Sequence, residues 1–392
     1  MVQIKAFEVE EWMDRLETTP GALNIAETCC ESVSIQELTQ LSTDKSAPGP
    51  LDIATRRLTY GAIYGSETTR KQIANLYDGD ISGSLPHEQV IITQGAIVAN
   101  FLLLYTLVGP GDHVICVYPT YQQLYEVPKS LGADVSLWKS KSSNGYIPDT
   151  QELLGLMIII NNPNNPTGVT TPKAVLQNIV DFAKSRNIIV MADEVYRPLF
   201  HSLPAGESMP PSILSLGYDR TVSTSSMSKA FSLAGIRLGW IASRDPEIIN
   251  AVKSARNYTT ISVSQLDDKV AAYALSDAVR PNLMKRNIEL AQTNLALLDA
   301  FVQKYSSICS WAKPTAGTTA MIRFQRDGEP VQDAEFCLEV LNKTGVLIMP
   351  GSTCFGDGAE FKGEMRFGYV CRTEVLINGL AKLGEYLDHD FN

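Results

Sequence analysis

One lysine, Lys229, lies in a segment whose neighbouring residues suit chemistry on a carbonyl group. Ser226 and Ser228 precede it, and Arg237 follows it. A lysine amine that loses its proton near neutral pH attacks an aldehyde and forms a Schiff base. Serine hydroxyls donate hydrogen bonds, and an arginine guanidinium binds phosphate oxygens through charge-assisted hydrogen bonds. The segment therefore predicts a nucleophilic lysine beside an anion-binding site.

The composition indicates a globular protein that acts on small molecules. The chain has 392 residues, of which 44% are hydrophobic and 19% are charged, and it has no low-complexity segment. This length predicts two or three domains, or one large α/β domain with an attachment. The net charge of −10 argues against nucleic acid or a membrane surface as a partner, because both require clustered Lys and Arg. No apolar run is long enough to span a membrane.

The cysteines and the first residues of the chain predict a cytoplasmic location. The seven cysteines are scattered, without a C-x-x-C pair, so neither a disulfide framework nor a zinc site is indicated. The segment MVQIKAFEVEEWMDRLE is acidic and lacks the apolar centre of a signal peptide. We expect reduced thiols and no metal site.

Short apolar runs alternate with helical stretches in the middle of the chain. The predicted strands cover residues 90–93, 113–117, 156–160, 188–192, 221–224 and 238–242. This alternation is typical of an α/β fold with a mainly parallel sheet covered on both faces by helices. After about residue 281 a long helical run and α+β elements follow. We expect a large domain of residues 46–280 and a smaller α+β domain formed by residues 1–45 and 281–392.

The polar side chains best suited to chemistry follow these predicted strands. In a sheet of this kind the ligand binds beyond the carboxyl ends of the strands. Aromatic, amide, carboxylate, phenol and lysine side chains all come at this position: Tyr121, Asn165, Asp193, Tyr196 and Lys229. We therefore expect these five residues to converge on one edge of the sheet.

A second anion-binding element is predicted after the strand at residues 90–93. Gly95 follows this strand and begins an apolar helical run. The N–H groups of Ala96 and Ile97 would then lie at a helix N-terminus, where the backbone favours a bound anion. A strand, a glycine and a helix also occur together for packing alone, so this pattern leaves both interpretations open.

Taken together, these motifs resemble those of the class I/II aminotransferases, which are fold-type I pyridoxal phosphate enzymes. The resemblance is carried by NNPNNPTG at 161–168, ADEVY at 192–196, SMSK at 226–229 with Arg237, and a late Arg366. It extends over nearly the whole chain. It implies a large domain with a mainly parallel sheet, a smaller α+β domain, and pyridoxal 5′-phosphate as the cofactor.

The resemblance implies a role for each residue around the cofactor ring. Lys229 would form the Schiff base and then carry the proton of the substrate α-carbon, which requires a lowered pKa. Asp193 would pair with the protonated ring nitrogen and keep the ring electron-withdrawing. Asn165 and Tyr196 would donate to the phenolate oxygen of the ring, and Tyr121 would stack on its face.

The remaining roles concern the phosphate, the substrate and a second subunit. The phosphate would be held by four groups: the N–H groups of Ala96 and Ile97, the hydroxyl of Ser226 and the guanidinium of Arg237. Many relatives carry a hydroxyl residue where this chain has Ala96 and Ile97, so one phosphate hydrogen bond is absent or comes from elsewhere. Arg366 would bind the substrate α-carboxylate in a bidentate pair. Tyr60 would reach the cofactor phosphate of a partner subunit, which implies a homodimer with shared sites.

The full set of residues favours transamination of an L-amino acid with a 2-oxo acid. The alternative is a lyase or cyclase that performs β- or γ-elimination or replacement. The segment 24–35 places Glu27 or Thr28 where a small residue is usual, and Glu27 could face a cationic substrate side chain. The segments 257–264 and 313–324 are similar to those of capreomycidine synthases. A third interpretation, a non-catalytic binding protein with this fold, is disfavoured because Lys229, Asp193 and Arg366 are all present.

Overall fold

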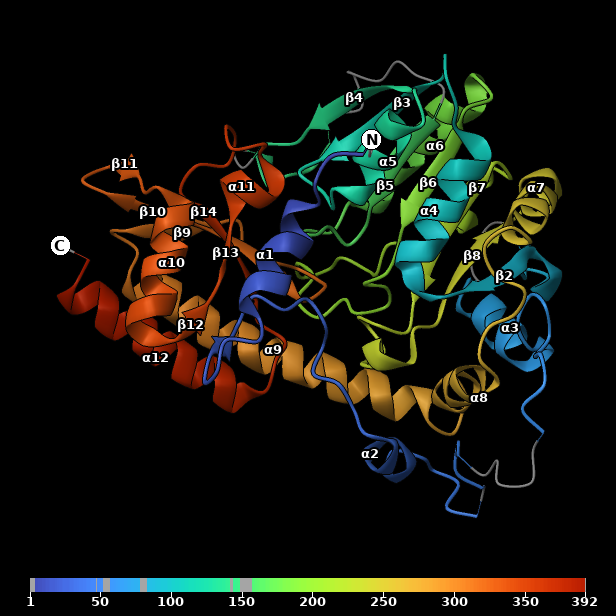
Figure 1. Ribbon diagram of the computed structural model, residues 1–392, viewed down its shortest axis with the longest axis horizontal. Helices are drawn as coiled ribbons and strands as arrows, with labels where there is room; N and C mark the ends of the chain where they lie inside the picture. The colour runs from blue at the N-terminus through green and yellow to red at the C-terminus, as the bar shows by residue number, and fades with distance from the viewer. Residues whose placement is uncertain are drawn as a thin grey trace.

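The centre of the molecule is a seven-stranded sheet with the strand order β2-β8-β7-β6-β5-β3-β4 (Figure 1). The computed structural model describes residues 4–46, 48–51, 57–77, 83–141, 144–148 and 157–391. The seven strands are β2 (Val90–Thr93), β3 (His113–Tyr118), β4 (Asp134–Lys139), β5 (Met157–Asn161), β6 (Ile189–Asp193), β7 (Thr221–Ser226) and β8 (Gly239–Ser243).

The strand directions bring almost all carboxyl ends to one edge of this sheet. Strands β4, β3, β5, β6 and β7 pair in parallel, and β8 is antiparallel to both β7 and β2. Strand β2 therefore runs in the same direction as β7. The register places Asn161 opposite Asp193, and Asp193 opposite Thr224. The prediction of an α/β fold with a mainly parallel sheet is confirmed.

Most of these strands could be predicted from the sequence because their residues are buried on both faces of the sheet. Every residue of β2, β5, β7 and β8 is buried, which is typical of a sheet covered on both faces. Strand β4 was not expected, because it lies at the sheet edge and its exposed residues alternate with partly buried ones and with the buried Trp138.

Helices pack on both faces of the large sheet. One face carries α4 (Gly95–Leu107), α5 (Gln123–Ser130) and α7 (Pro246–Arg256), whose apolar residues share one core cluster. The other face carries α3 (Glu67–Ala74), α6 (Lys173–Ser185) and α8 (Gln265–Ala274), which belong to a second core cluster. The helix and strand boundaries thus follow the apolar pattern of the sequence closely.

A smaller sheet forms the second part of the molecule, with the strand order β11-β10-β14-β13 and β9 paired to β10. Its strands are β9 (Cys309–Trp311), β10 (Thr319–Arg326), β11 (Glu329–Pro330), β13 (Met349–Pro350) and β14 (Glu364–Gly368). Helices α1 (Glu8–Leu16), α10 (Asp333–Thr344), α11 (Gly351–Phe355) and α12 (Thr373–His389) surround it. This is the smaller α+β unit expected from the sequence.

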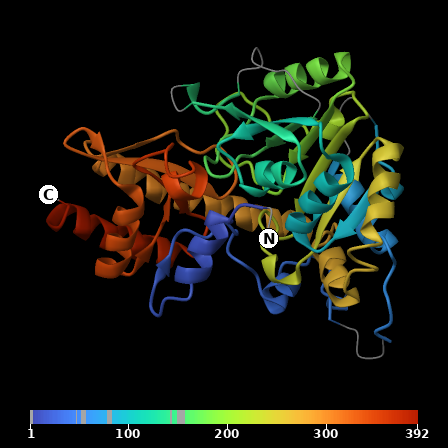
Figure 2. The ribbon, with the colours of Figure 1, turned by 45° about the horizontal axis from the view of Figure 1, so that its top comes forward.

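The N-terminal segment packs with this C-terminal part. Strand β1 (Leu23–Asn24) pairs in parallel with β12 (Val346–Leu347), and Trp12 and Ile25 are buried in the same core cluster as Phe367. Figure 2 shows the N-terminal segment between the two parts of the molecule. Residues distant in the chain thus form one wall beside the large sheet.

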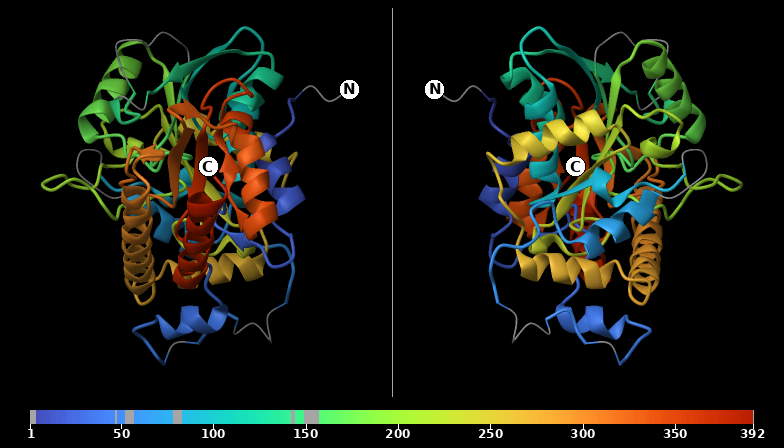
Figure 3. Two further views of the ribbon diagram at one scale, coloured as in Figure 1. Left: turned by 90° about the vertical axis from the view of Figure 1, so that its left-hand side faces the viewer. Right: turned by 90° about the vertical axis from the view of Figure 1, so that its right-hand side faces the viewer.

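One long helix, α9 (Arg280–Lys304), connects the two parts. Its first half contributes Leu283 to a core cluster of the large sheet, and its second half contributes Leu298 to the core of the small part. Helices α9 and α12 lie side by side (Figure 3). Helix α2 (Ile35–Gln40) packs on the large part through Leu38. The domain boundaries near residues 45 and 280 remain a prediction.

None of the helices in the described ranges combines the length and the apolar character that a membrane span requires.

Candidate active site

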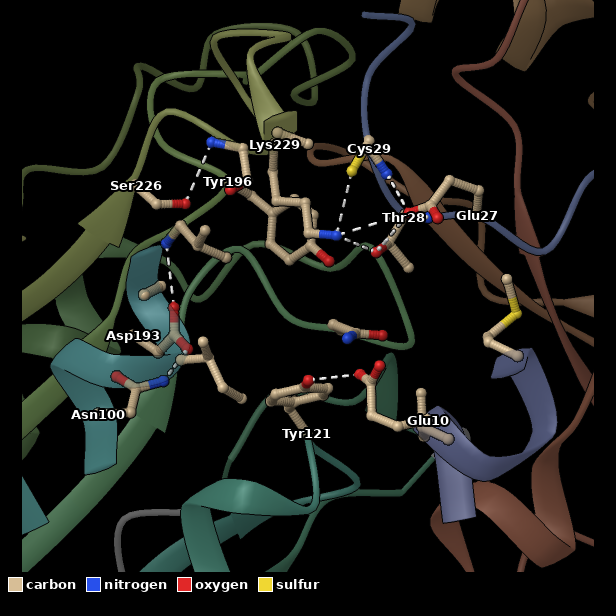
Figure 4. A pocket seen from close by; sticks show the side chains of 18 of the residues that line it. Glu10, Glu27, Thr28, Cys29, Asn100, Tyr121, Asp193, Tyr196, Ser226 and Lys229 are labelled. Atoms are coloured by element: carbon tan, nitrogen blue, oxygen red, sulfur yellow. Dashed lines mark hydrogen bonds and ion pairs between the residues drawn. The ribbon is translucent and has the colours of Figure 1, made fainter. Parts of the chain in front are cut away.

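A cavity of about 470 Å³ opens at the carboxyl edge of the large sheet, beside the small part (Figure 4). This volume is typical of a site for a small molecule. The cavity wall contains eleven of the twelve residues predicted from the sequence: Lys229, Asp193, Asn165, Tyr196, Tyr121, Ala96, Ile97, Ser226, Arg237, Arg366 and Glu27. The twelfth, Tyr60, does not line this cavity, and 74% of its surface is exposed.

The amine of Lys229 is surrounded by three consecutive residues of the N-terminal segment. Its Nζ atom lies 2.5 Å from Thr28 Oγ1, 3.4 Å from Cys29 Sγ and 3.6 Å from Glu27 Oε1. Lys229 follows β7, and its side chain points across the cavity toward this segment (Figure 4). The amine is therefore held at the join between the two parts of the molecule.

The charges around this amine determine its protonation. Burial lowers the pKa of Lys229, but Cys29, Glu27 and Tyr196 raise that pKa above its ordinary value. Burial raises the pKa of Cys29, although the charge of Lys229 opposes this shift. Burial also acts to raise the pKa of Glu27, but Lys229 and the N–H groups of Cys29 and Thr28 lower it to about 2. The pKa of the free amine is thus raised rather than lowered in this arrangement, because Cys29 and the Glu27 carboxylate favour its charged form.

Backbone contacts fix the segment that carries these three residues. Glu27 Oε1 accepts hydrogen bonds from the N–H groups of Thr28 and Cys29 over 2.6 and 2.9 Å. Thr318 Oγ1 donates to the carbonyl of Thr28 over 2.6 Å. A Cβ atom at Gly368 would lie 1.6 Å from the Glu27 carbonyl oxygen, so β14 can approach the segment only with glycine there. The position of Glu27 thus depends on strands near the other end of the chain.

Asp193 ends β6 and lies 4% exposed at the base of the cavity. Its Oδ2 atom accepts a hydrogen bond from Asn100 Nδ2 over 3.0 Å, and its Oδ1 atom accepts one from the Val195 N–H over 3.1 Å. Burial raises the pKa of Asp193 to about 6, although these two donors oppose the shift. Among the described residues, no lysine, arginine or histidine forms an ion pair with it. A buried carboxylate of this kind fits a cationic ring nitrogen, which would compensate its charge.

Sequence reasoning missed Asn100 and Thr224. Asn100 is 1% exposed, and its Oδ1 atom accepts a hydrogen bond from Thr224 Oγ1 over 2.5 Å. Asn100 could have been identified from the sequence, because it is the one polar side chain in the otherwise apolar run GAIVANFLLL. A polar residue buried within such a helix requires a hydrogen-bond partner.

The predicted phosphate site lies where α4 begins. Gly95 has φ +80°, and a Cβ atom there would lie 2.9 Å from Arg237 Nη2. A Cβ atom at Gly239 would lie 2.3 Å from the Gly95 carbonyl carbon and 2.6 Å from the Ala96 nitrogen. Two glycines thus let Arg237 and β8 approach the helix N-terminus directly.

Ser226 also lines the cavity, and its hydroxyl accepts a hydrogen bond from the Ser228 N–H over 3.2 Å. Helix N–H groups, a guanidinium and hydroxyls together suit a phosphate.

Arg366 lies on β14 at the opposite wall and is 2% exposed. Its Nη2 atom donates to the Ala26 carbonyl over 2.9 Å, and its Nη1 atom donates to Asn165 Oδ1 over 3.3 Å. Its Nε atom is buried without a hydrogen-bond partner in the described structure. A buried guanidinium with an unused donor suits a carboxylate ligand.

The aromatic residues of the cavity come from both parts of the molecule. Tyr121 follows β3, and its hydroxyl donates to Glu10 Oε1 of α1 over 2.6 Å. Its ring centroid lies 4.8 Å from that of Phe7. Tyr196 is 2% exposed, and burial raises its pKa, although Lys229 and Arg366 oppose the shift.

The contribution of α1 to the cavity was not predicted from the sequence. Glu10 and Glu17 line the cavity together with Glu27. Burial and the charges of Glu27 and Glu10 raise the pKa of Glu17. The amphipathic pattern of α1 predicts a helix but does not indicate which surface it covers. The outer wall of the cavity is therefore acidic.

Comparison with known proteins agrees with this arrangement. The family model for aminotransferase class I and II matches residues 35–382. A crystal structure of a PLP-dependent aminotransferase from Streptococcus suis is 37% identical, covers 98% of both chains and has a TM-score of 0.87. The structure of the PLP-dependent cyclase OrfR is 25% identical, with 98% and 97% coverage and a TM-score of 0.85. Capreomycidine synthase from Streptomyces vinaceus is 27% identical over 317 residues, which are 77% of this chain and 75% of that protein.

The family match extends over the strands and loops that form the cavity, from α2 to α12. The residues that line it include a lysine amine, a buried carboxylate and an arginine guanidinium, which are groups that suit pyridoxal phosphate. The chain belongs to the aminotransferase class I and II family of pyridoxal phosphate-dependent enzymes.

Proposed function

We propose that this protein is an aminotransferase that transfers the α-amino group of an L-amino acid to a 2-oxo acid. One observation carries the proposal: Lys229, Asp193 and Arg366 line the same cavity, with both Asp193 and Arg366 buried. A nucleophilic amine, a partner for a cationic ring and a site for a carboxylate are the groups that this reaction needs.

When it is bound, pyridoxal phosphate supplies an aldehyde for the amine and a ring that withdraws electrons from the substrate α-carbon. The protein groups then divide the remaining tasks. Lys229 holds and returns the proton of the α-carbon, and Asp193 keeps the ring nitrogen protonated. Asn165 and Tyr196 would donate to the ring oxygen, and Tyr121 would cover the ring face. The phosphate would be held by Ala96, Ile97, Ser226 and Arg237.

Arg366 fixes the substrate by its α-carboxylate. Its Nε atom has no partner among the described residues, and Nη1 contacts only Asn165 Oδ1 at 3.3 Å, so the guanidinium retains donors for a bidentate pair. Such a pair orients the amino acid, so that its α-carbon lies near the amine of Lys229. Orientation of this kind accounts for much of the rate enhancement in bimolecular reactions.

We also propose a homodimer in which Tyr60 contributes to the site of the partner subunit. Tyr60 has a large exposed aromatic surface, and Leu58, Ile63 and Tyr258 are similarly exposed. Exposed apolar residues in such numbers favour a protein interface. A cytoplasmic location is supported by the cysteines, all seven of which are free.

A second candidate function is a lyase or cyclase acting on an amino acid with a cationic side chain. Two observations favour it: Glu10, Glu17 and Glu27 line the outer cavity, and two of the similar proteins are a cyclase and capreomycidine synthase. A cationic side chain would be attracted to this acidic wall. Glu27 is then a substrate-binding residue.

The deciding experiment mixes the protein, loaded with pyridoxal phosphate, with a panel of amino acids in the absence of any oxo acid. Absorbance and products are recorded together. One oxo acid per site, with conversion of the cofactor to pyridoxamine phosphate, supports the aminotransferase. Repeated turnover with release of ammonia, a side-chain fragment or a cyclic amino acid contradicts it and supports the second candidate.

The same panel tests the preference for a cationic substrate. Glu27→Gln is expected to weaken binding of arginine-type substrates and to leave binding of neutral amino acids nearly unchanged. Unchanged activity with arginine-type substrates would remove the support for Glu27 as a substrate-binding residue.

A further inference from the structure

We propose that Thr224 and Asn100 form a positioning relay that directs the carboxylate of Asp193 toward the ring nitrogen of the cofactor. The inference rests on the proposed role of Asp193, and it adds two residues that act through it. Neither residue was identified from the sequence, and neither has a surface on the outside of the protein, because both are almost completely buried.

The hydrogen bonds of Asn100 fix the orientation of its side-chain amide. Thr224 Oγ1 donates to Oδ1 over 2.5 Å, so the Nδ2 group must face Asp193 Oδ2, which it contacts over 3.0 Å. The opposite orientation would place an amide oxygen against a carboxylate oxygen. The second proton of Nδ2 points to Gln123 Oε1 at 3.3 Å, and Gln123 Nε2 donates to the Ile97 carbonyl over 2.6 Å. The side-chain donors and acceptor of Asn100 are thus all occupied, which makes the arrangement rigid.

Each member of the relay is placed by a different element. The parallel pairing of β6 and β7 sets Asp193 opposite Thr224. Asn100 lies in the second turn of α4, and the first turn of that helix carries the N–H groups of Ala96 and Ile97. One helix therefore positions both the phosphate site and the partner of Asp193, which couples the two ends of the cofactor site.

The relay matters because Asp193 lies in a setting that disfavours its charge. Burial and the neighbouring Glu194 raise the pKa of Asp193, and Lys229 lowers it only as the smallest of the contributions. The hydrogen bonds from Asn100 Nδ2 and from the Val195 N–H oppose this rise. Only an ionised Asp193 can pair with a protonated ring nitrogen. Loss of Asn100 or of its orientation would favour the neutral acid.

The experiment compares two ligands that differ only at the ring nitrogen: pyridoxal phosphate and its 1-deaza analogue, in which a C–H group replaces that nitrogen. Dissociation constants are measured for the wild type, Asn100→Leu, Thr224→Val and Thr224→Ser. We expect the wild type to prefer pyridoxal phosphate. Asn100→Leu and Thr224→Val should reduce this preference by about tenfold, which is the effect of one charge-assisted hydrogen bond. Thr224→Ser keeps the hydroxyl and should keep the preference.

Two results would overturn the relay. If Asn100→Leu and Thr224→Val weaken both ligands equally, their role is structural only. If the preference is unchanged in Thr224→Val, which differs from the wild type by one hydroxyl and keeps its shape, the threonine does not orient the amide. Failure of the wild type to bind pyridoxal phosphate at all is a different result, because it would overturn the proposed function itself and the relay with it.

Discussion

Glu27 Oε1 lies 3.6 Å from Lys229 Nζ, so a carboxylate of the N-terminal segment forms an ion pair with the lysine that follows β7. Thr28 Oγ1 lies closer still, at 2.5 Å. The contact joins the small part of the molecule to the large sheet at the reactive amine. The N-terminal segment therefore places a negative charge beside the amine of Lys229.

Glu27→Gln is expected to lower the pKa of Lys229, because the variant removes the negative charge beside the amine. Reductive methylation of Lys229, followed by mass spectrometry across a range of pH, measures this pKa. The rate at about pH 8 should rise several-fold, since each unit of pKa changes the fraction of free amine up to tenfold. Glu31→Gln is the control, because Glu31 pairs with Arg372 at 2.8 Å and not with Lys229. An unchanged pH profile in Glu27→Gln contradicts the assignment.

Lys229→Ala is expected to abolish turnover and the covalent link to pyridoxal phosphate. The link is detected by borohydride treatment of the loaded protein and mass measurement of the peptides. Lys343→Ala is a suitable control, because Lys343 is exposed and pairs with Glu339 on the surface of α10. Retention of a reducible link in Lys229→Ala would move the reactive amine to another lysine.

The stability of the protein freed of pyridoxal phosphate should depend on Asp193 and on pH. Burial raises the pKa of Asp193 from 3.8 to about 6. Its stabilising contribution is therefore fully present below about pH 4 and is lost as the pH rises through about 6, a change of about 3 kcal/mol. We expect the free energy of unfolding of Asp193→Asn, relative to wild type, to increase over this range. Denaturant unfolding at several pH values measures the difference, and a constant difference would exclude the shifted pKa.

Arg366→Lys should weaken the amino-acid substrate by about 10- to 100-fold and leave the affinity for pyridoxal phosphate nearly unchanged. A lysine supplies one point charge and cannot form the bidentate pair, which accounts for a loss of about 1.5–3 kcal/mol. Substrate titration and cofactor titration are compared in the same preparation. If the cofactor is lost instead, Arg366 belongs to the cofactor site.

Gly239→Ala should lower the affinity for pyridoxal phosphate at least tenfold. The new Cβ atom would lie 2.3 Å from the Gly95 carbonyl carbon, so the backbone at the start of α4 must move. Overpacking of this kind costs about 1–3 kcal/mol. Gly235→Ala is the matched control, because a Cβ atom at Gly235 would have no described atom within 4 Å outside its chain neighbours. Equal cofactor affinity in both variants would mean that β8 does not shape the phosphate site.

The sequence alone predicted the large sheet and the residues at its edge for a clear physical reason. Strands buried on both faces appear as continuous apolar runs, and parallel strands bring their carboxyl ends together. Asp193 and Lys229 each follow such a run closely, so their convergence could be expected from the apolar pattern alone. Strand β4 escaped detection because an edge strand has no continuous apolar run.

Other parts of the site depend on contacts that leave no local pattern. Glu10 reaches Tyr121 only because α1 packs against the small part of the molecule. Asn100 forms hydrogen bonds with Thr224 and Asp193 only because α4 packs on the large sheet.

The sequence by itself determined the fold class and the family, and it predicted which residues line the cavity, because these depend on apolar periodicity and on short motifs. The tertiary structure decided which charges surround those residues. The raised pKa of Lys229 is the clearest case, since the sequence predicted the opposite shift. Its causes include Cys29 and Glu27, neighbours in the N-terminal segment, which the pairing of β1 with β12 and the glycine of β14 hold beside the amine. Electrostatic interactions act through space, so they could be assigned only after the fold had set these distances.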